Sequence, residues 1–210
     1  NAVDISGTAS ELTAALVTAD TLVVAGTATA NITDEATTDI EAAVLSAIGA
    51  KTSGQVTVTN AINVTGNADQ AVAALVTDDT KVSVTDAVIT LSDDPDLTEL
   101  GQLNSATTGT IKISTQNKAY SGSATALATA LTGTITDNDD NAFNGNITIA
   151  DEAGTSVAAT LLSTIGAGTA GIATVTNAIH ITGSVSETTA ALHTESSKVV
   201  ACLLYTSDAA

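Results

Sequence analysis

The chain has 210 residues, with 23 acidic residues against 5 lysines, only 1% aromatic residues and a formal net charge of −18. Binding to nucleic acid or to an anionic membrane surface requires clustered Lys and Arg, so this composition excludes both partners. A hydrophobic content of 44% separates the chain from disordered acidic sequences, and we expect it to fold.

The first residues carry no targeting signal. The chain begins with Asn1, and no basic segment followed by an apolar one comes after it. No apolar run approaches the roughly 18 residues that cross a bilayer, so we predict no membrane insertion of this segment. We expect a fragment of a longer protein.

One nine-residue stretch returns along the chain. VTNAINVTG at 58–66 recurs as VTNAIHITG at 175–183, an offset of 117 residues, and its second half resembles NAVDISG at 1–7. Leucines separated by 28 to 31 residues subdivide this period: Leu16, Leu45, Leu75, Leu103, Leu131, Leu162 and Leu192. We interpret residues 1–201 as a single repeat array of about seven coils of about 29 residues.

Each coil is predicted to contain two strands joined by a polar corner. Val56 and Val58, and then Ile62 and Val64, alternate with polar residues, which indicates strands with one buried face. Turn-forming pairs lie at the corners, Thr136-Asp137 among them. Four corner residues are expected to stack as a structural hydrogen-bonded ladder. They are Asn60, Asp86, Asn117 and Asn177.

Short helices are predicted after the second strands. AAVLSAIGA at 42–50 reads as a helix, whose apolar stripe is Ile40, Ala43, Val44, Ala47 and Ile48. Ala124, Leu127, Ala128 and Leu131 repeat this spacing. Asp94, Pro95 and Asp96 signal the start of another helix, with a capping acid and a first-turn proline.

The residue after the strand alternates between two types. It is Gly at 7, 66, 122 and 183, and Asp at 34, 93 and 151. The predicted fold is an α/β solenoid of stacked coils, with parallel strands and short Ala-rich helices. Neighbouring repeats of the same chain are then the partners that bury each coil's apolar face. Tandem immunoglobulin-like β-sandwiches are the alternative fold.

One segment suggests a metal site. In TDNDDNAFNGN at 136–146, Asp137, Asp139 and Asn141 alternate, which lets oxygen ligands converge on Ca²⁺. The segment departs from the EF-hand loop, because Ala142 stands where Gly is needed and Thr148 replaces the bidentate Glu. A longer polar loop at a corner is the alternative interpretation.

No catalytic residues are predicted. His180 aligns with Asn63 and Asp4 in the equivalent coils, which indicates a tolerated surface position rather than a catalytic base. No nucleophile elbow or phosphate loop occurs. We therefore expect a protein that is not an enzyme, and a solenoid polysaccharide-active enzyme is a less favoured alternative because Arg is absent and Lys is scarce.

The texture of residues 1–201 resembles a known class of repeats. Its Ala, Thr, Val and Asp content and its motifs ITD, VTG and AAL resemble the β-strand repeats of giant bacterial secreted and surface proteins, which sometimes accompany calcium-binding RTX repeats. The resemblance implies a secreted or cell-surface location and a spacer or stalk function in an adhesin-like protein. The alternative is a calcium-stabilised module that binds carbohydrate or another cell.

The last nine residues differ from everything before them. CLLYTSDAA at 202–210 contains the only Cys of the chain and resembles a translated sequencing adapter. We interpret this segment as a non-native tail and exclude it from the fold.

Overall fold

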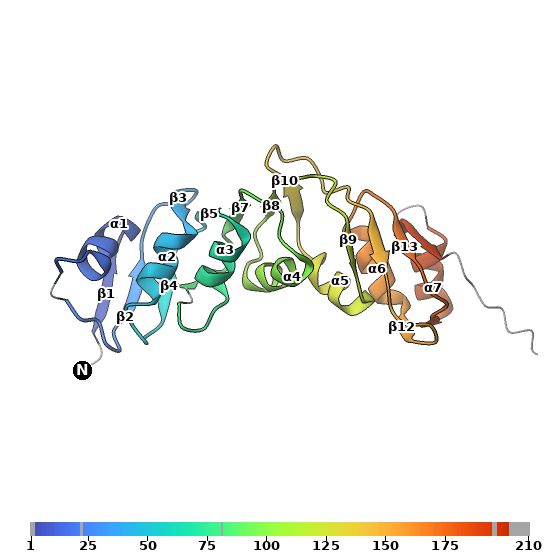
Figure 1. Cartoon of the computed structure of the whole chain (residues 1–210), viewed down its shortest axis with the longest axis horizontal. Helices are drawn as coiled ribbons and strands as arrows, with labels where there is room; N and C mark the ends of the chain where they lie inside the picture. The colour runs from blue at the N-terminus through green and yellow to red at the C-terminus, as the bar shows by residue number, and fades with distance from the viewer. Residues whose placement is uncertain (1–2, 22, 81, 195–196, 202–210) are drawn as a thin grey trace, which may run out of the picture. The chain divides into compact units, whose positions relative to one another are not determined.

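The computed structural model describes residues 3–21, 23–80, 82–194 and 197–201. They form an α/β structure of parallel strands and short helices (Figure 1). This confirms the predicted class at that level. The chain divides into two compact units. Unit 1 comprises Asn1–Pro95 and Gln102–Ser114, and unit 2 comprises Asp96–Gly101 and Thr115–Ala210.

Unit 1 contains eight strands, three helices and one π-helical turn among its described residues. In chain order they are β1 (Asp4–Gly7), α1 (Ala9–Leu12), the π-helical η1 (Thr13–Val17), β2 (Thr29–Ile32), β3 (Asp39–Glu41), α2 (Ala42–Gly49), β4 (Val56–Val58), β5 (Asn63–Gly66), α3 (Ala68–Leu75), β6 (Val82–Ser83), β7 (Val88–Leu91) and β8 (Ile111–Ile113). Helix α4 (Leu97–Ala106) has residues in both units.

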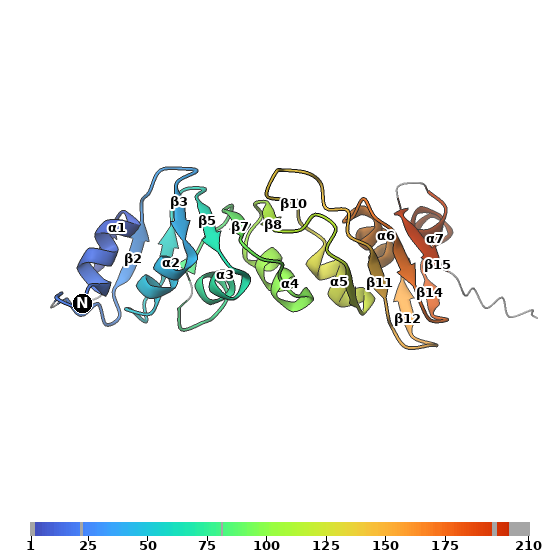
Figure 2. The same ribbon diagram turned by 45° about the horizontal axis from the view of Figure 1, so that its top comes forward.

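The strands of unit 1 form two parallel sheets. The first has the order β1-β2-β4-β6, and in the second β3, β5, β7 and β8 are neighbours in that order. Each strand pairs with one in the next strand-and-helix segment of the chain, as Ala30 does with Val56. Figure 2 shows α2 and α3 side by side next to these strands, and the two helices are in contact.

Unit 2 has a similar order of elements. They are β9 (Tyr120–Gly122), α5 (Ala124–Ala130), β10 (Ile135–Asp137), β11 (Ile147–Ile149), β12 (Ser156–Ala158), α6 (Ala159–Ala167), β13 (Ala173–Val175), β14 (His180–Thr182), α7 (Val185–Leu192) and β15 (Val199–Ala201). One parallel sheet has the order β15-β13-β11-β9, and β12 and β14 form a second parallel pair. Helices α5 and α6 are in contact, as are α6 and α7.

This pairing differs from the alternative fold considered above. Immunoglobulin-like sandwiches are built from antiparallel sheets, whereas every printed pair of named strands in the described residues is parallel, as in the pairs β5-β7 and β13-β15. Short helices also separate the strands. The sandwich alternative is therefore wrong for both units.

The interior of each unit is aliphatic. In β4, Val56 and Val58 are buried and Thr57 between them is exposed, as period-two alternation predicts. Helix α2 contributes Leu45 and Ile48, which are both 0% exposed. Unit 2 adds one aromatic pair, Tyr120 and Phe143, with ring centroids 5.9 Å apart and planes tilted by 49°.

The position of α2 was predicted correctly, but its buried face was not. Ile40 belongs to β3 and Ala43 is exposed, while the buried positions of α2 are Ala42, Leu45, Ile48 and Gly49. The change from strand to helix at residue 42 shifts the phase of the pattern. Helix α5 has no strand residue in its stripe, and all four predicted positions there are buried.

The start of α4 also differs in detail from the prediction. Asp96 is the capping acid, since its Oδ1 accepts from the Glu99 amide at 2.8 Å while Glu99 Oε2 accepts from the Asp96 amide at 2.7 Å. Pro95 precedes this cap instead of lying in the first turn. The reciprocal pair is a capping box.

Paired strands are closer in the sequence than the leucine series suggests. Paired residues lie between 22 positions apart, for Ile89 and Ile111, and 27 apart, for Tyr120 and Ile147. The leucine spacing of about 29 is larger because its members occupy different helical turns. Leu45 is the fourth residue of α2, and Leu75 is the last of α3.

Candidate functional site: the contacts between layers

We call a helix, together with the strand or strands directly before it, a layer. Four helices that follow a Gly turn begin with a capping side chain of their own: Thr8, Asn67, Ser123 and Ser184. Each accepts from the amide three residues on, which satisfies one of the donors that a helix start leaves unpaired. In three of them the side chain at that third position reaches back to the cap and completes a capping box.

Two capping carboxylates have perturbed titration. The Thr8 backbone amide holds the pKa of Glu11 below its ordinary value, and the Thr8 hydroxyl adds to this effect. The Ser184 backbone amide and hydroxyl lower the pKa of Glu187 in the same way. Donors that bond the ionised carboxylate favour the charged form.

A second cap comes from the adjacent layer. The first amide of α1, at Ala9, donates to Asp34 Oδ2 at 2.7 Å, and the first amide of α3, at Ala68, donates to Asp93 Oδ1 at 2.9 Å. In unit 2 the first amide of α5, at Ala124, donates to Asp151 Oδ2 at 2.7 Å. A carboxylate at a helix N-terminus also interacts favourably with the helix dipole.

Strand register explains why an Asp reaches these amides. Gly66 at the end of β5 pairs with Leu91 at the end of β7. Two residues further along each chain segment, Ala68 and Asp93 are neighbours. The same step leads from the pair Gly7 and Ile32 to Ala9 and Asp34, and from Gly122 and Ile149 to Ala124 and Asp151.

The alternation of Gly and Asp in the sequence therefore has a physical basis. The Gly turns leave room for the capping box: a Cβ on Gly66 would lie 2.9 Å from Gln70 Oε1, and one on Gly7 would lie 3.0 Å from Glu11 Oε2. The Asp turns supply the carboxylate to the helix that follows the Gly. The two turn types are the two halves of one contact.

Two of the four predicted corner residues join this network. Asn60 Nδ2 donates to the Asp34 carbonyl oxygen at 2.7 Å, and Asn177 Nδ2 donates to the Asp151 carbonyl oxygen at 2.7 Å. The bonds run from side chain to backbone rather than from one corner side chain to the next. Their acceptors are the Asp residues whose carboxylates cap helices.

The other two corner residues lie elsewhere in this pattern. Asp86 lies between β6 and β7, and its ionised carboxylate has no hydrogen to donate to a carbonyl. Asn117 follows β8 in the sequence. For neither side chain does the described part of the chain contain a printed hydrogen bond of this kind.

A Thr-x-Gly motif forms another contact between layers. The Thr107 hydroxyl donates to the Ala87 carbonyl at 2.7 Å and accepts from the Gly109 amide at 3.0 Å. The Thr169 hydroxyl bonds the Gly145 carbonyl at 2.7 Å and the Gly171 amide at 2.9 Å in the same way. Thr52 has an equivalent pair of partners in Ala28 and Gly54.

Both Thr107 and Thr169 are buried, at 5% and 6% exposure. The Gly of the motif is required because its Cβ would overlap the neighbouring backbone, the Ala87 carbonyl oxygen in the case of Gly109. Gly166 in α6 is restricted similarly by the Ser197 carbonyl oxygen. These positions let adjacent layers approach at backbone distance.

The predicted calcium residues lie in the loop that follows β10. Asp137 Oδ1 accepts from the Asp139 and Asn141 amides, at 2.9 and 2.8 Å, and Asp137 Oδ2 accepts from Asn141 Nδ2 at 2.9 Å. Thr136 and Ala142 form an antiparallel bridge, so Thr136-Asp137 opens a hairpin instead of turning a corner. The buried ring of Phe143 anchors its far end.

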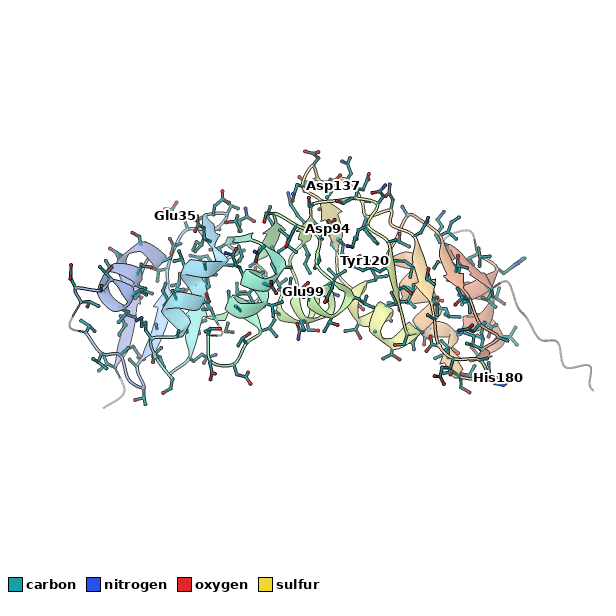
Figure 3. All side chains as sticks on the ribbon, viewed as in Figure 1. Glu35, Asp94, Glu99, Tyr120, Asp137 and His180 are labelled. Atoms are coloured by element: carbon teal, nitrogen blue, oxygen red, sulfur yellow. The ribbon has the colours of Figure 1, made fainter. Side chains whose placement is uncertain are left out.

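The loop geometry is that of a side chain holding its own turn. Within the described ranges, no group of three or more His, Cys, Asp or Glu side chains is arranged to hold a metal ion. Figure 3 shows Asp137 at the exposed tip of this loop and His180 far from it in the same unit. Calcium binding therefore stays a prediction for titration.

A polar hollow of about 590 Å³ lies on unit 1. Its lining includes Gly26, Lys51, Thr52, Asp78 and Asp79, and no aromatic side chain. Binding pockets for small molecules are mostly apolar, with a few polar groups that fix orientation. This hollow lacks that character.

The chain matches no protein-family model, and no curated protein or solved structure is significantly similar to it. No helix in the described residues has the length and apolar character needed to cross a membrane. We therefore infer function from contacts within the chain.

Proposed function

We propose that the chain is a non-catalytic structural segment, a spacer or stalk, of a secreted or cell-surface adhesin-like protein. In this proposal the layers form an α/β solenoid in which each layer is completed by the next. Such proteins gain stability from each repeat and from each interface between neighbours.

The observation that carries the proposal is the recurrence of one set of contacts between layers. Parallel strand pairs, a carboxylate on the first helical amide and a Thr hydroxyl on a neighbouring carbonyl occur in both units. The most specific side-chain bonds of the described residues thus connect one layer with another. A segment that transmits tension benefits from many similar small interfaces.

The proposed location rests on composition and on the resemblance of the repeats. Residues 1–201 contain no Cys, and a net charge of −18 keeps a surface segment well solvated. The proposed partners in the parent protein are further repeats of the same chain.

Force spectroscopy of the full chain, held by handles at both termini, tests the layered spacer. Paired strands lie about 25 residues apart, so the loss of one layer should lengthen the chain by roughly 90 Å. We expect a series of such steps. One or two events that release most of the chain at once would contradict a spacer built from separable layers.

A binding assay tests the alternative of a calcium-stabilised module. Glycan arrays probed with the full chain in millimolar Ca²⁺ and in chelator are expected to give no saturable binding. A Ca²⁺-dependent glycan signal, together with a Ca²⁺-dependent rise in melting temperature, would favour the binding module over the spacer.

A further inference from the structure

We propose that β14 and α7 form a docking face for one further β-strand, and that this strand must carry an Asp two residues beyond its end. The inference rests on the proposed layered function and specifies the chemistry of the partner. Its evidence is a comparison of two equivalent layers, one covered and one open.

The covered layer is that of β5 and α3, which lies 117 residues before β14 and α7. Strand β5 pairs on one side with β3 and on the other with β7. Strand β14 pairs with β12, and the described residues contain no strand on its second side. Its hydrogen-bonding edge therefore corresponds to the edge that β7 covers in unit 1.

Exposure follows the same contrast. In α3, Ala68, Ala71, Ala74 and Leu75 are buried, whereas in α7 only Ala191 is buried. Val185 at the start of α7 is 85% exposed, and its counterpart Ala68 is 2% exposed. An additional strand and its turn would cover apolar surface here, which stabilises the assembly.

The capping chemistry identifies the partner. Helix α7 has its own box of Ser184 and Glu187, as α3 has its box of Asn67 and Gln70. In α3 the first amide also receives Asp93 from the next layer. The equivalent carboxylate for Val185 would come from position 210, which is Ala in this sequence and lies outside the described residues.

The first strand of the additional layer is already present. Strand β15 pairs with β13 as β6 pairs with β4. In unit 1 the chain continues from β6 through a corner into β7, which covers β5. The open edge of β14 thus continues an interface that is established inside the same fold.

A second copy of this chain fits less well than an Asp-type strand. Its first strand, β1, ends at Gly7, and the residue two positions on is Ala9. A copy stacked in the same direction would offer no carboxylate to Val185. We therefore assign the face to a strand of the type seen in β7, which ends at Leu91 and is followed by Asp93.

The test replaces Cys202–Ala210 with a second copy of Thr85–Ser114. This puts the copied Leu91 at position 208 and the copied Asp93 at position 210, which preserves the spacing of 25 residues between Ala68 and Asp93. Hydrogen exchange at the Val185 amide and limited proteolysis of the appended segment are measured. We expect at least tenfold slower exchange and protection from the protease.

Two variants of the appended copy separate the cap from general packing. Asp93→Ala in the copy should restore fast exchange at Val185, whereas Ser92→Ala, at an exposed neighbour, should leave it slow. Fast exchange and rapid cleavage in the unsubstituted fusion would overturn the docking face. Self-association of the original chain through α7 in ultracentrifugation would overturn the choice of partner.

These outcomes are independent of the force experiment. The existing layers can unfold one at a time even if the appended layer does not dock. Conversely, docking of the appended layer would survive a result in which the whole chain unfolds in one event.

Discussion

Replacing Asp93 with Ala removes a carboxylate of one layer from the helix start of another. The bond joins the Ala68 amide to Asp93 Oδ1 at 2.9 Å, and Ala68 is 2% exposed. A hydrogen bond to a charged acceptor contributes about 1.5 to 3 kcal/mol. Asp93 itself is exposed, so solvent screens part of this interaction, and we expect a loss of about 1 to 2 kcal/mol in the free energy of unfolding.

The assay is urea denaturation of the full chain, with hydrogen exchange at the Ala68 amide as the local readout. Asp93→Asn keeps an acceptor oxygen, so it should cost about half as much or less. Asp78→Ala removes the same charge from an exposed site without a printed hydrogen bond, and it corrects for relief of repulsion in a chain of net charge −18. Equal effects of Asp93→Ala and Asp78→Ala, with unchanged exchange at Ala68, would refute the cross-layer cap.

Three other perturbations address the remaining contacts. Thr107→Val strands a buried amide and a carbonyl and should cost about 1 to 3 kcal/mol in urea denaturation, whereas Thr107→Ser should recover most of it; equal losses would argue against the hydroxyl. Gly166→Ala forces a Cβ against the Ser197 carbonyl and should lower the melting temperature by several degrees, while Gly101→Ala, whose Cβ would meet nothing closer than 3.7 Å, should raise it or leave it unchanged. The Glu187 carboxyl should titrate by NMR below its ordinary pKa of 4.5, so its capping contribution is present above about pH 4.5 and is lost as the pH falls through the lowered value; a midpoint at or above 4.5 would show that the box does not form in solution.

Local patterns in the sequence predicted the elements well where one periodicity acts alone. The alternation at Val56 and Val58 and the stripe of α5 both match the buried positions, and helix α2 lies where AAVLSAIGA predicted it. The stripe assigned to α2 was wrong because Ile40 ends a strand immediately before the helix begins. A single helical period cannot describe both sides of such a junction.

The contacts between layers were harder to predict because their partners are far apart in sequence. The alternation of Gly and Asp turns was visible, but its meaning depends on the register that brings Asp93 beside Ala68. The Thr-x-Gly motif also recurs visibly, at Thr52, Thr107 and Thr169. Without a neighbouring backbone these triplets look like ordinary turns.

The predicted calcium loop shows the opposite difficulty. Alternating Asp137, Asp139 and Asn141 fit a ligand pattern, but a short polar side chain can also satisfy its own loop amides. Asp137 accepts three such bonds from Asp139 and Asn141. Spacing alone does not distinguish these two uses of a carboxylate.

Cross-strand NOEs measured by NMR on the isotopically labelled full chain test the central claim most directly. The account predicts contacts between backbone protons of strands about 25 residues apart, such as those joining Ala173 in β13 to Ile147 in β11 and to Val199 in β15. Contacts that instead join β13 to β14 in antiparallel register would contradict it, because the layers would then be hairpins that close on themselves.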